Sequence, residues 1–403
     1  MYLASLILLA GLTYGNYRFA QEAPGGNDFL PRWLGTRDWV TQGLSPYDPK
    51  ISVEAQNIIY GRPANVQAGE DLANFAYPLP IVLFILPFSL LPYTLARALW
   101  MTVLELCLPV LILMGIRLAG WRPKPIGLGA LMLFSVIWYP GFRAVILGQF
   151  AVIEAVLVTA ALLAIQRRMD SAAGVLLALS LAKPQLVVLL IPFVLLWAWS
   201  RGRTSLIVWT VGASVLLVAF FMLLMPDWPL QWIRQVIAYP SYTVAGSPIS
   251  LLADTMPATD PYLSLILTGL ALLYMLWEWV LAWGKFDPWF QWAAAMTLVV
   301  TQLVSFRTAS TNYLVFTMAI LLVFSVWTQR WKRTGVAATV VACLAMVAAP
   351  WALFLMTVQG NQESSWMLVP LPFFVLFGLW WVRWWVTRSN VLQIGDYDTP
   401  RYL

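Results

Sequence analysis

After its first hydrophobic segment the chain reads Gly25-Gly26-Asn27-Asp28-Phe29-Leu30-Pro31-Arg32-Trp33. Glycine and asparagine before an aspartate are ordinary turn chemistry, so the simplest interpretation makes Asp28 a turn residue. The stretch nevertheless places this carboxylate between a hydrophobic segment and an aromatic-rich stretch that suits a membrane interface. That position favours a functional acid at the mouth of a membrane-embedded cavity.

The composition is that of an integral membrane protein. Of the 403 residues, 61% are hydrophobic and only 10% are charged, and the mean hydropathy is +0.76. A soluble domain carries about 25% charged residues, so this chain lacks the polar side chains to cover a globular surface. The apolar runs are long and continuous, which favours helices of about 20 residues over the alternating strands of a barrel. The sequence therefore predicts an all-α polytopic membrane protein.

The hydrophobic pattern predicts a bundle of about 12–13 transmembrane helices. The predicted segments are residues 1–17, 77–91, 94–116, 126–140, 150–166, 171–182, 185–200, 205–225, 262–283, 288–304, 311–328, 335–357 and 366–386. We expect a single transmembrane domain over residues 1–403, with extracytoplasmic loops at 18–76 and 226–261 and a C-terminal tail at 387–403. The first segment lacks a basic start and a clear cleavage site, so we interpret it as an anchor.

The first loop, residues 18–76, is long, polar and rich in glycine and proline. Within it, residues 36–43 predict a short interfacial helix with Thr36 as its N-cap and Gly43 at its C-terminal end. Loops of this length are usually functional or disordered, and the aromatic residues here argue against disorder. We therefore expect this loop to carry the acid of a functional site.

Basic residues between the segments indicate the orientation, because short cytoplasmic loops are rich in lysine and arginine. The residues assigned to the cytoplasmic side are Arg117, Arg122, Lys124, Arg167, Arg168, Arg201, Arg203, Lys285, Arg330, Lys332, Arg333, Arg383 and Arg388. On this assignment Arg143, Gln149, Lys183 and Arg307 share the opposite side.

The start of the chain conflicts with this assignment. If segments 77–91 and 94–116 both cross the membrane, Arg117 lies outside. Either the proline-rich segment 77–91 does not fully span, or the positive-inside signal fails there.

The residue inventory excludes several kinds of site. The chain has no histidine, which removes histidine zinc sites, Ser-His-Asp triads and histidine proton relays. Cys107 and Cys343 both lie in apolar runs and form neither a CxxC motif nor a disulfide framework. No basic cluster interleaved with aromatics stands apart from the membrane segments, so we expect no nucleic-acid partner.

Charges at membrane depth cost at least about 2.5 kcal/mol each, so each one needs a reason. Lys183 precedes Pro184 between two short apolar runs that the proline would break into half-helices. It is either a phosphate ligand or a lysine that snorkels to the interface. Arg307 is either a phosphate ligand or an interfacial anchor. Arg143 and Gln149 flank a short turn and either contact substrate or cap a helix.

Acidic residues also lie in or near the apolar runs. For Glu105, Glu154 and Glu278 we favour a structural role, either protonated or paired with a neighbouring helix. Glu70-Asp71 is either a second acidic element near the cavity mouth or part of a solvated loop, and we favour the solvated loop.

A set of short motifs follows in order along the first half of the chain. The motifs are Asn27-Asp28-Phe29, Gly43-Leu44-Ser45-Pro46-Tyr47-Asp48-Pro49, Tyr77-Pro78-Leu79-Pro80, Leu86-Pro87-Phe88-Ser89-Leu90-Leu91-Pro92, Arg97-Ala98-Leu99-Trp100, Gly148-Gln149-Phe150, Ala173-Gly174 and Leu181-Ala182-Lys183-Pro184-Gln185. This ordered set resembles the polytopic GT-C glycosyltransferases, nearest to glycosyltransferase family 87. The second half resembles the family in hydropathy only. Arg307, Thr311 and Asn312 stand where such enzymes often carry histidines.

The resemblance implies a GT-C-like bundle that transfers a sugar, often mannose or another hexose, from a polyprenyl-phosphate donor. It implies a multi-pass protein of the cell membrane that works on the extracytoplasmic side, without a metal or a cofactor. The implied partners are membrane lipids, the lipid-linked sugar, and a glycan, glycolipid or protein acceptor.

The resemblance also implies roles for particular residues. Asp28 becomes the general base, and a single displacement inverts the anomeric centre. The departing phosphate needs cationic stabilisation, for which Lys183, Arg307 and Arg143 are the candidates. The remaining residues expected to bind substrate are Gln149, Arg32 and Tyr77.

Other classes stay open at this point. One is a transporter or flippase of a lipid-linked or small polar solute, and another is a non-catalytic scaffold or a polymer ligase of related architecture. A transporter needs polar residues along a path through both leaflets, and many transporters carry internal repeats. Here the polar residues gather at one face and no repeat is evident, which favours the enzyme.

Overall fold

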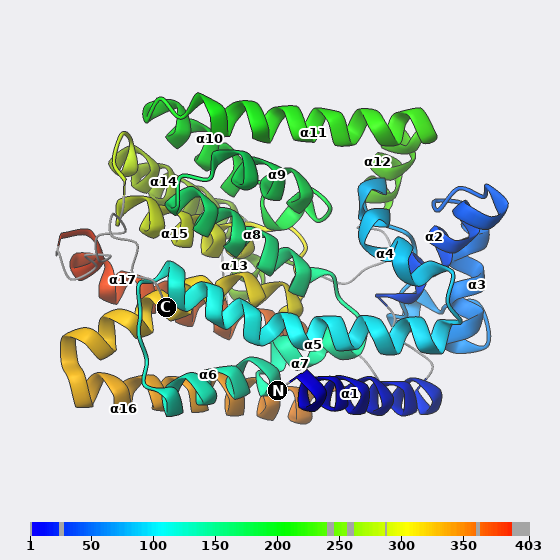
Figure 1. Ribbon diagram of the computed structural model, residues 1–403, viewed down its shortest axis with the longest axis horizontal. Coiled ribbons are helices and arrows are strands. Elements are labelled where there is room, and N and C mark those ends of the chain that lie inside the picture. The colour runs from blue at the N-terminus through cyan, green and yellow to red at the C-terminus, as the bar shows by residue number, and fades with distance from the viewer. Residues whose placement is uncertain are drawn as a thin grey trace.

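The computed structural model describes residues 2–23, 28–239, 246–255, 262–286, 288–359 and 363–388. Every regular element in these ranges is a helix, as Figure 1 shows. The α-helices are α1 (Tyr2–Glu22), α2 (Leu30–Gln42), α3 (Pro49–Tyr60), α4 (Val82–Ser89), α5 (Tyr93–Leu118), α6 (Pro125–Ile137), α7 (Tyr139–Leu147), α8 (Ala151–Gln166), α9 (Asp170–Ser180), α10 (Leu190–Ser200), α11 (Thr204–Leu224), α12 (Trp228–Ala238), α13 (Pro248–Ala253), α14 (Leu263–Ala282), α15 (Trp289–Val304), α16 (Thr317–Thr357) and α17 (Pro370–Arg388). The 3-10 helices are η1 (Val66–Ala68), η2 (Leu79–Ile81), η3 (Pro184–Leu186), η5 (Ser310–Phe316) and η6 (Ser365–Leu368).

Within the described ranges, 5 helical segments are long and apolar enough to cross a membrane. They are α5, α11, α14, Ser310–Thr357 and Ser365–Arg388, and α6 with α7, bent by 50°, makes a possible sixth. Other predicted segments form shorter helices, such as the 11-residue α9 and α10. Such a helix is about 16 Å long, against a hydrocarbon core of about 30 Å. The prediction of an all-α polytopic membrane protein is confirmed, and several predicted segments are half-length helices.

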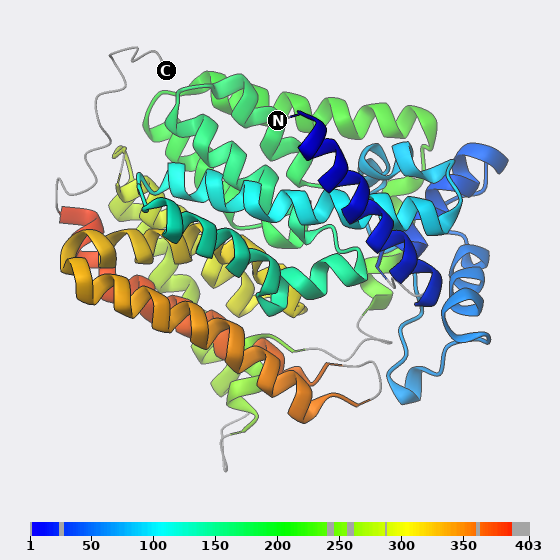
Figure 2. The same ribbon diagram turned by 60° about the horizontal axis from the view of Figure 1, so that its bottom comes forward.

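α1 lies across α5, as Figure 2 shows, and polar side chains join the two helices. The Nδ2 atom of Asn16 donates to the hydroxyl of Thr102 over 3.1 Å and to the carboxylate of Glu105 over 2.8 Å. Glu105 therefore pairs with a neighbouring helix, as predicted. The interpretation of α1 as an anchor stays a prediction, because α1 is not among the helices that meet the criteria for a span.

The proline-rich segment 77–91 does not cross the membrane by itself. It forms η2 and the 8-residue α4, with Pro87 inside the helix. α4 packs on α2, and the indole N–H of Trp33 donates to the carbonyl oxygen of Phe88 over 3.0 Å. α5 then runs from the end of the molecule that carries α2–α4 to the opposite end (Figure 1). A helix of the length of α4 is shorter than the hydrocarbon core, which favours the alternative in which segment 77–91 does not fully span.

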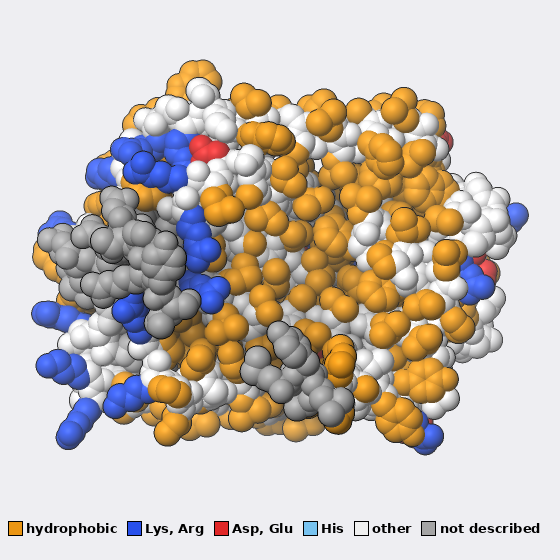
Figure 3. All heavy atoms as spheres, viewed as in Figure 1, with side chains coloured by type: hydrophobic (Ala, Val, Ile, Leu, Met, Phe, Trp, Pro, Cys, Tyr) orange, Lys and Arg blue, Asp and Glu red, His pale blue; other side chains and the backbone are white. Residues whose placement is uncertain are grey.

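Basic side chains concentrate at one end of the molecule. Most of the lysine and arginine side chains visible in Figure 3 lie at the left of the view, over one end of α10 and the reversal within α16, with a broad hydrophobic surface beside them. This distribution fits a bundle whose apolar belt faces lipid and whose basic end faces one aqueous side.

α9 and α10 form a hairpin that carries Lys183 in its turn. α9 ends at Ser180 and α10 begins at Leu190, with η3 between them. Proline lacks a backbone N–H and cannot continue a helix, so the predicted break at Pro184 is confirmed. Asp170 at the start of α9 forms an ion pair with Arg203 just beyond α10, so the two helices return to the same end.

α16 also contains a break. Lys332 has φ of 47° and ψ of −114° inside it, so the predicted segments 311–328 and 335–357 are two helices joined by a sharp reversal.

Candidate active site

Asp28 stands at the start of α2, where the first loop docks on the bundle. The backbone N–H groups of Asp28 and Phe29 donate to the carbonyl oxygen of Leu147, over 3.2 and 3.3 Å. The ring of Phe29 stacks on Trp100, whose indole N–H donates to the carbonyl oxygen of Gly148 over 2.9 Å. Gly148 has φ of +70°, and a Cβ atom there would lie 2.5 Å from the Cβ of Phe29. This glycine therefore allows α2 to start against the turn between α7 and α8.

The helix that follows Asp28 begins earlier than predicted. α2 starts at Leu30, and Thr36 is buried within it, so the prediction of Thr36 as an N-cap is wrong. Leu30 is fully buried against the bundle, and Pro31 suits the first helical turn because it needs no hydrogen-bond acceptor. The predicted C-terminal end at Gly43 is confirmed by its left-handed φ of 69°. Residues 25–27 of the opening stretch lie outside the described residues.

Arg32 connects Asp28 with the interior of the bundle. Its Nη2 atom lies 3.4 Å from the Oδ1 atom of Asp28, and its Cζ atom lies 4.0 Å from the ring centroid of Tyr77. Arg32 is only 6% exposed, and within the described residues its Nε and Nη1 atoms have no hydrogen-bond partner. Buried N–H groups are nearly always paired in proteins, so these two donors point to a ligand as their partner.

Tyr77 lies close to a second cation, Lys183. The Nζ atom of Lys183 lies 5.8 Å from the ring centroid of Tyr77. The hydroxyl of Tyr47 donates to the carbonyl oxygen of Tyr77 over 2.8 Å, and Phe150 packs edge-on against the Tyr77 ring. One fixed aromatic ring therefore has a guanidinium and an ammonium beside it.

Lys183 is buried in the bundle and held by two amide side chains. Its Nζ atom donates to Gln149 Oε1 over 3.0 Å and to Asn312 Oδ1 over 2.8 Å. The amide of Asn312 donates to the hydroxyl of Thr308, which donates to Gln302 Oε1 over 2.8 Å. With an exposure of 3%, Lys183 does not fit the interpretation of a lysine that snorkels to the interface.

The two arginines predicted beside Lys183 have other contacts. The Nε atom of Arg143 lies 2.8 Å from the Oε1 atom of Glu363, whose Oε2 atom accepts a hydrogen bond from Ser310 over 2.7 Å. The Cζ atom of Arg307 lies 5.6 Å from the ring centroid of Tyr239. Their roles as phosphate ligands stay predictions. The predicted residues that the structure brings into one site are Asp28, Arg32, Tyr77, Gln149 and Lys183.

The buried acids have different surroundings. Glu278 forms an ion pair with Arg383 over 2.7 Å, which is the predicted pairing with a neighbouring helix. Glu154 is fully buried, has no hydrogen-bond partner within the described residues, and interacts electrostatically with Lys183. The sequence did not reveal Asn312 as a partner of Lys183, although a polar run inside an apolar stretch was the available signal.

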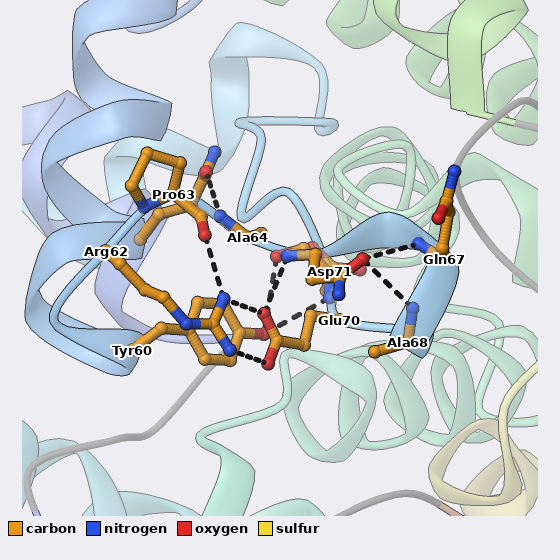
Figure 4. A network of polar contacts seen from close by, with 10 residues as sticks. Tyr60, Arg62, Pro63, Ala64, Gln67, Ala68, Glu70 and Asp71 are labelled. Carbon is orange, nitrogen blue, oxygen red and sulfur yellow. Dashed lines mark hydrogen bonds and ion pairs between the residues drawn. The ribbon is translucent and has the colours of Figure 1, made fainter.

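The loop after α3 carries the Glu70-Asp71 pair, which Figure 4 shows from close by. Arg62 donates two hydrogen bonds to the carboxylate of Glu70, over 2.7 and 2.8 Å. The hydroxyl of Tyr60 accepts a hydrogen bond from the backbone N–H of Asp71 over 3.2 Å. Glu70 therefore secures the loop, while Asp71 stays exposed beside it.

Asp71 interacts electrostatically with Asp28 and Arg32. Asp71 is exposed, yet protein surrounds it on several sides, and this loss of hydration raises the pKa of its carboxyl. The N–H of Ala73, which donates to Asp71 over 2.6 Å, lowers that pKa. The charge of Asp28 raises the same pKa and the charge of Arg32 lowers it. Asp71 is exposed on this loop, in agreement with the solvated loop favoured from the sequence.

Part of the chain matches a known protein family. The sequence model of glycosyltransferase family 87 matches residues 75–254, a range that contains Tyr77, Gln149 and Lys183 but not Asp28. No curated protein and no solved structure matches the chain. The family match supports a membrane glycosyltransferase. Over residues 75–254, this chain is similar to glycosyltransferase family 87, the family that its ordered motifs resemble.

Proposed function

We propose that the protein is a GT-C-type hexosyltransferase that moves mannose or another hexose from a polyprenyl-phosphate donor to a glycan, glycolipid or protein acceptor. One observation carries this proposal. A continuous series of contacts runs from the carboxylate of Asp28 through Arg32 and the ring of Tyr77 to the ammonium of Lys183. A displacement at an anomeric carbon needs a base and a cation in one site, and this series supplies both.

Asp28 acts as the general base in this proposal. Its carboxylate takes the proton of an acceptor hydroxyl while that oxygen bonds to the anomeric carbon of the donor. The bond between the anomeric carbon and the phosphate oxygen breaks in the same step, and the electron pair leaves with the phosphate. Because the acceptor attacks opposite the leaving group, the anomeric configuration inverts.

Lys183 stabilises the departing phosphate. An ammonium carries three N–H donors, and Gln149 and Asn312 accept two of them, which leaves one for a phosphate oxygen. The charge acts in a site with little water, where electrostatic stabilisation is stronger than in bulk solvent. A phosphate monoester leaves without being protonated, so the reaction needs no general acid, and this cation takes the place that a metal ion would have.

The distribution of charge supports one orientation in the membrane. By the positive-inside rule the basic end of the bundle faces the cytoplasm. The end that carries α2–α4, where Asp28 lies, then faces the extracytoplasmic side of the cell membrane, where a lipid-linked sugar serves as the donor.

A transporter or flippase is the second candidate. The α9–α10 hairpin is a pair of half-helices with its turn inside the bundle, a feature that many transporters use to bind solutes. The family match over this hairpin favours the glycosyltransferase.

A donor screen tests the proposed function. Membranes that contain the protein would receive polyprenyl-phosphate mannose, polyprenyl-phosphate glucose or nucleotide sugars, and products would be identified by mass. We expect one lipid-linked donor to give a product heavier by one hexose, with an equal amount of polyprenyl phosphate released. Transfer from nucleotide sugars only, or solute transport without transfer, would overturn the proposal.

A further inference from the structure

A cavity lies between α17 and the two halves of α16, and it shares no residue with the proposed active site. Its volume is about 460 Å³, within the range of about 300–1,000 Å³ that small-molecule sites occupy. Aromatic, aliphatic and methionine side chains make most of its wall, and none of the described residues that line it carries a charge. Phe377 and Trp381 of α17, which line it, are each 63% exposed, so the cavity opens at the surface of the bundle. The cavity therefore suits an apolar ligand that enters from the lipid.

The cavity follows the first half of α16 over about the depth of one membrane leaflet. Ile320 and Trp331 both line it, and the helix between them rises about 16 Å. Half of a hydrocarbon core of about 30 Å is about 15 Å. The cavity therefore matches in length the part of an acyl chain that lies in one leaflet.

Tryptophans mark the end of the cavity at which a lipid head group would lie. The ring of Trp331 packs edge-on against Trp381 and Trp385, with ring centroids 6.3 and 5.2 Å apart. Tryptophan is enriched at membrane–water interfaces, where its ring lies at the level of the head groups. The end of the cavity at Trp331 therefore belongs at an interface, and the end at Ile320 belongs in the hydrocarbon.

Three cations flank the interface end of the cavity. Trp331 and Thr334 line the cavity at the reversal within α16. Arg330, Lys332 and Arg333 are their neighbours in the chain; all three are exposed, and none has a hydrogen bond or an ion pair within the described residues. Lys332 has φ of 47°, and such strained backbone clusters at ligand sites and switches. Unpaired positive charges beside an apolar cavity are complementary to an anionic head group on an apolar chain.

We propose that this cavity binds an anionic phospholipid of the leaflet at the basic end of the bundle. One acyl chain lies between α16 and α17, and the phosphate lies against Arg330, Lys332 and Arg333. A zwitterionic lipid fills the cavity with the same chain, but its own ammonium group offsets the attraction between its phosphate and the three cations. A second copy of the chain fits this surface poorly, because a symmetric contact would bring two copies of the basic turn together.

This inference does not depend on the proposed function, because no step of sugar transfer uses the cavity. The positive-inside rule assigns the basic end of the bundle to the cytoplasm. The lipid therefore belongs to the cytoplasmic leaflet, at the opposite end of the bundle from Asp28.

Lipid binding to the purified full-length protein in detergent, measured by native mass spectrometry, tests the inference. The probes are dioleoyl phosphatidylglycerol, dioleoyl phosphatidylcholine and inorganic phosphate. We expect phosphatidylglycerol to bind at least about tenfold more tightly than phosphatidylcholine, because each basic residue near the head group adds to the attraction. We expect inorganic phosphate not to bind, because it has no chain to fill the cavity.

A double variant tests the contact with the head group. Arg330→Gln together with Arg333→Gln should remove the preference for phosphatidylglycerol and leave weak binding of both lipids. Arg167→Gln together with Arg168→Gln is the matched control, since it removes the same charge from two exposed arginines just after α8. The control should keep the preference of the wild type.

Gly378 of α17 lines the cavity and allows a test of the contact with the acyl chain. A Cβ atom there would lie 3.5 Å from the methyl groups of Val323, which is an ordinary contact, so Gly378→Ala should bind both lipids as the wild type does. Gly378→Leu places a larger side chain in the cavity and should weaken the binding of both lipids. Melting temperatures without added lipid should be similar in the two variants, which separates a blocked cavity from a folding defect.

Several results would overturn the inference. They are equal binding of the two lipids by the wild type, a preference that survives in the double variant of Arg330 and Arg333, and lipid binding that Gly378→Leu does not weaken. Binding of inorganic phosphate as tight as that of phosphatidylglycerol would show that the cavity contributes nothing. A dimer that forms in place of the lipid complex would assign the surface to a second copy of the chain.

Discussion

The backbone N–H of Asp28 donates a hydrogen bond to the carbonyl oxygen of Leu147 over 3.2 Å. This bond attaches the start of the first loop's helix to the turn of Gly148 and Gln149. Because Gln149 also holds Lys183, the same turn sets the positions of the proposed base and of the proposed phosphate cation. The short motif Gly148-Gln149-Phe150 therefore has a structural reason to occur in the chain.

Gly148→Ala should displace Asp28. The new Cβ would lie 2.5 Å from the Cβ of Phe29, in addition to the cost of about 1–2 kcal/mol for a left-handed residue that is not glycine. We expect at least a tenfold loss of transfer. Gly202→Ala is the matched control, since Gly202 also has a positive φ, of 65°, but meets nothing within 4 Å. Equal loss of activity in the two variants would contradict the role of the Gly148 turn.

Lys183→Met should lower kcat for transfer by about 100-fold, the size of effect seen when one preorganised donor to a developing charge is removed. The reason is that methionine approximately keeps the length of the side chain but carries no positive charge to stabilise the negative charge of the departing phosphate. Transfer from a radiolabelled lipid-linked donor measures the effect, and Lys124→Met, at an exposed position, should behave as wild type. Retention of full activity in Lys183→Met would remove Lys183 from the site.

Arg143 and Glu363 should contribute to stability as a pair. The two side chains are each 20% exposed and are 2.8 Å apart, so a double-mutant cycle should give a coupling of about 1 kcal/mol. The variants are Arg143→Met, Glu363→Gln and their combination, compared by unfolding in detergent. We expect the KM for the lipid-linked donor to stay unchanged in both single variants. A higher donor KM in Arg143→Met alone would show that this arginine binds the phosphate, as the sequence predicts.

The contributions of the neighbouring acids Glu70 and Asp71 to folding stability should depend on pH in opposite directions. The hydrogen bonds from Arg62 lower the pKa of Glu70, so its contribution to stability is present above the ordinary pKa of about 4.3 and is lost as pH falls through the lower native value. For Asp71, loss of hydration raises the native pKa, so its ionisation costs stability as pH rises through and above the ordinary value.

Melting temperatures of Glu70→Gln and Asp71→Asn between pH 3 and pH 7 measure these two effects. Relative to wild type, Glu70→Gln should be most destabilised at pH 7 and approach wild type at low pH. Asp71→Asn should gain relative stability as pH rises. Parallel curves for the two variants would contradict the opposite surroundings of the two acids.

Much of the site could be predicted from the sequence, because the chemistry of single residues in a membrane is restrictive. A lysine between two apolar runs is costly in a membrane, so Lys183 was a candidate site residue from the sequence alone. The break at Pro184 follows from the missing N–H of proline. The turn at Gly148 and the carboxylate after the first segment were likewise visible as ordered motifs.

Other features depend on contacts between distant segments and left no local signal. The early start of α2 accompanies the burial of Leu30 and the stacking of Phe29 on Trp100 of α5, which override the capping preference of Thr36. Asn312 lies in η5 and Lys183 follows α9, and the two residues meet because η5 and α9 both pack on α8. The loop of Glu70 and Asp71 is held by hydrogen bonds from Ser52 and Gln56 of α3 to Leu72, contacts that residue spacing does not encode.

The most direct test of the central claim is the rate of hexose transfer by Asp28→Asn, measured with a radiolabelled polyprenyl-phosphate sugar. Asparagine preserves the size of the side chain and the backbone bonds to Leu147 but cannot take a proton from the acceptor. We expect kcat to fall by at least about 100-fold while donor binding and melting temperature stay close to those of the wild type. Transfer at the wild-type rate by Asp28→Asn would contradict the account.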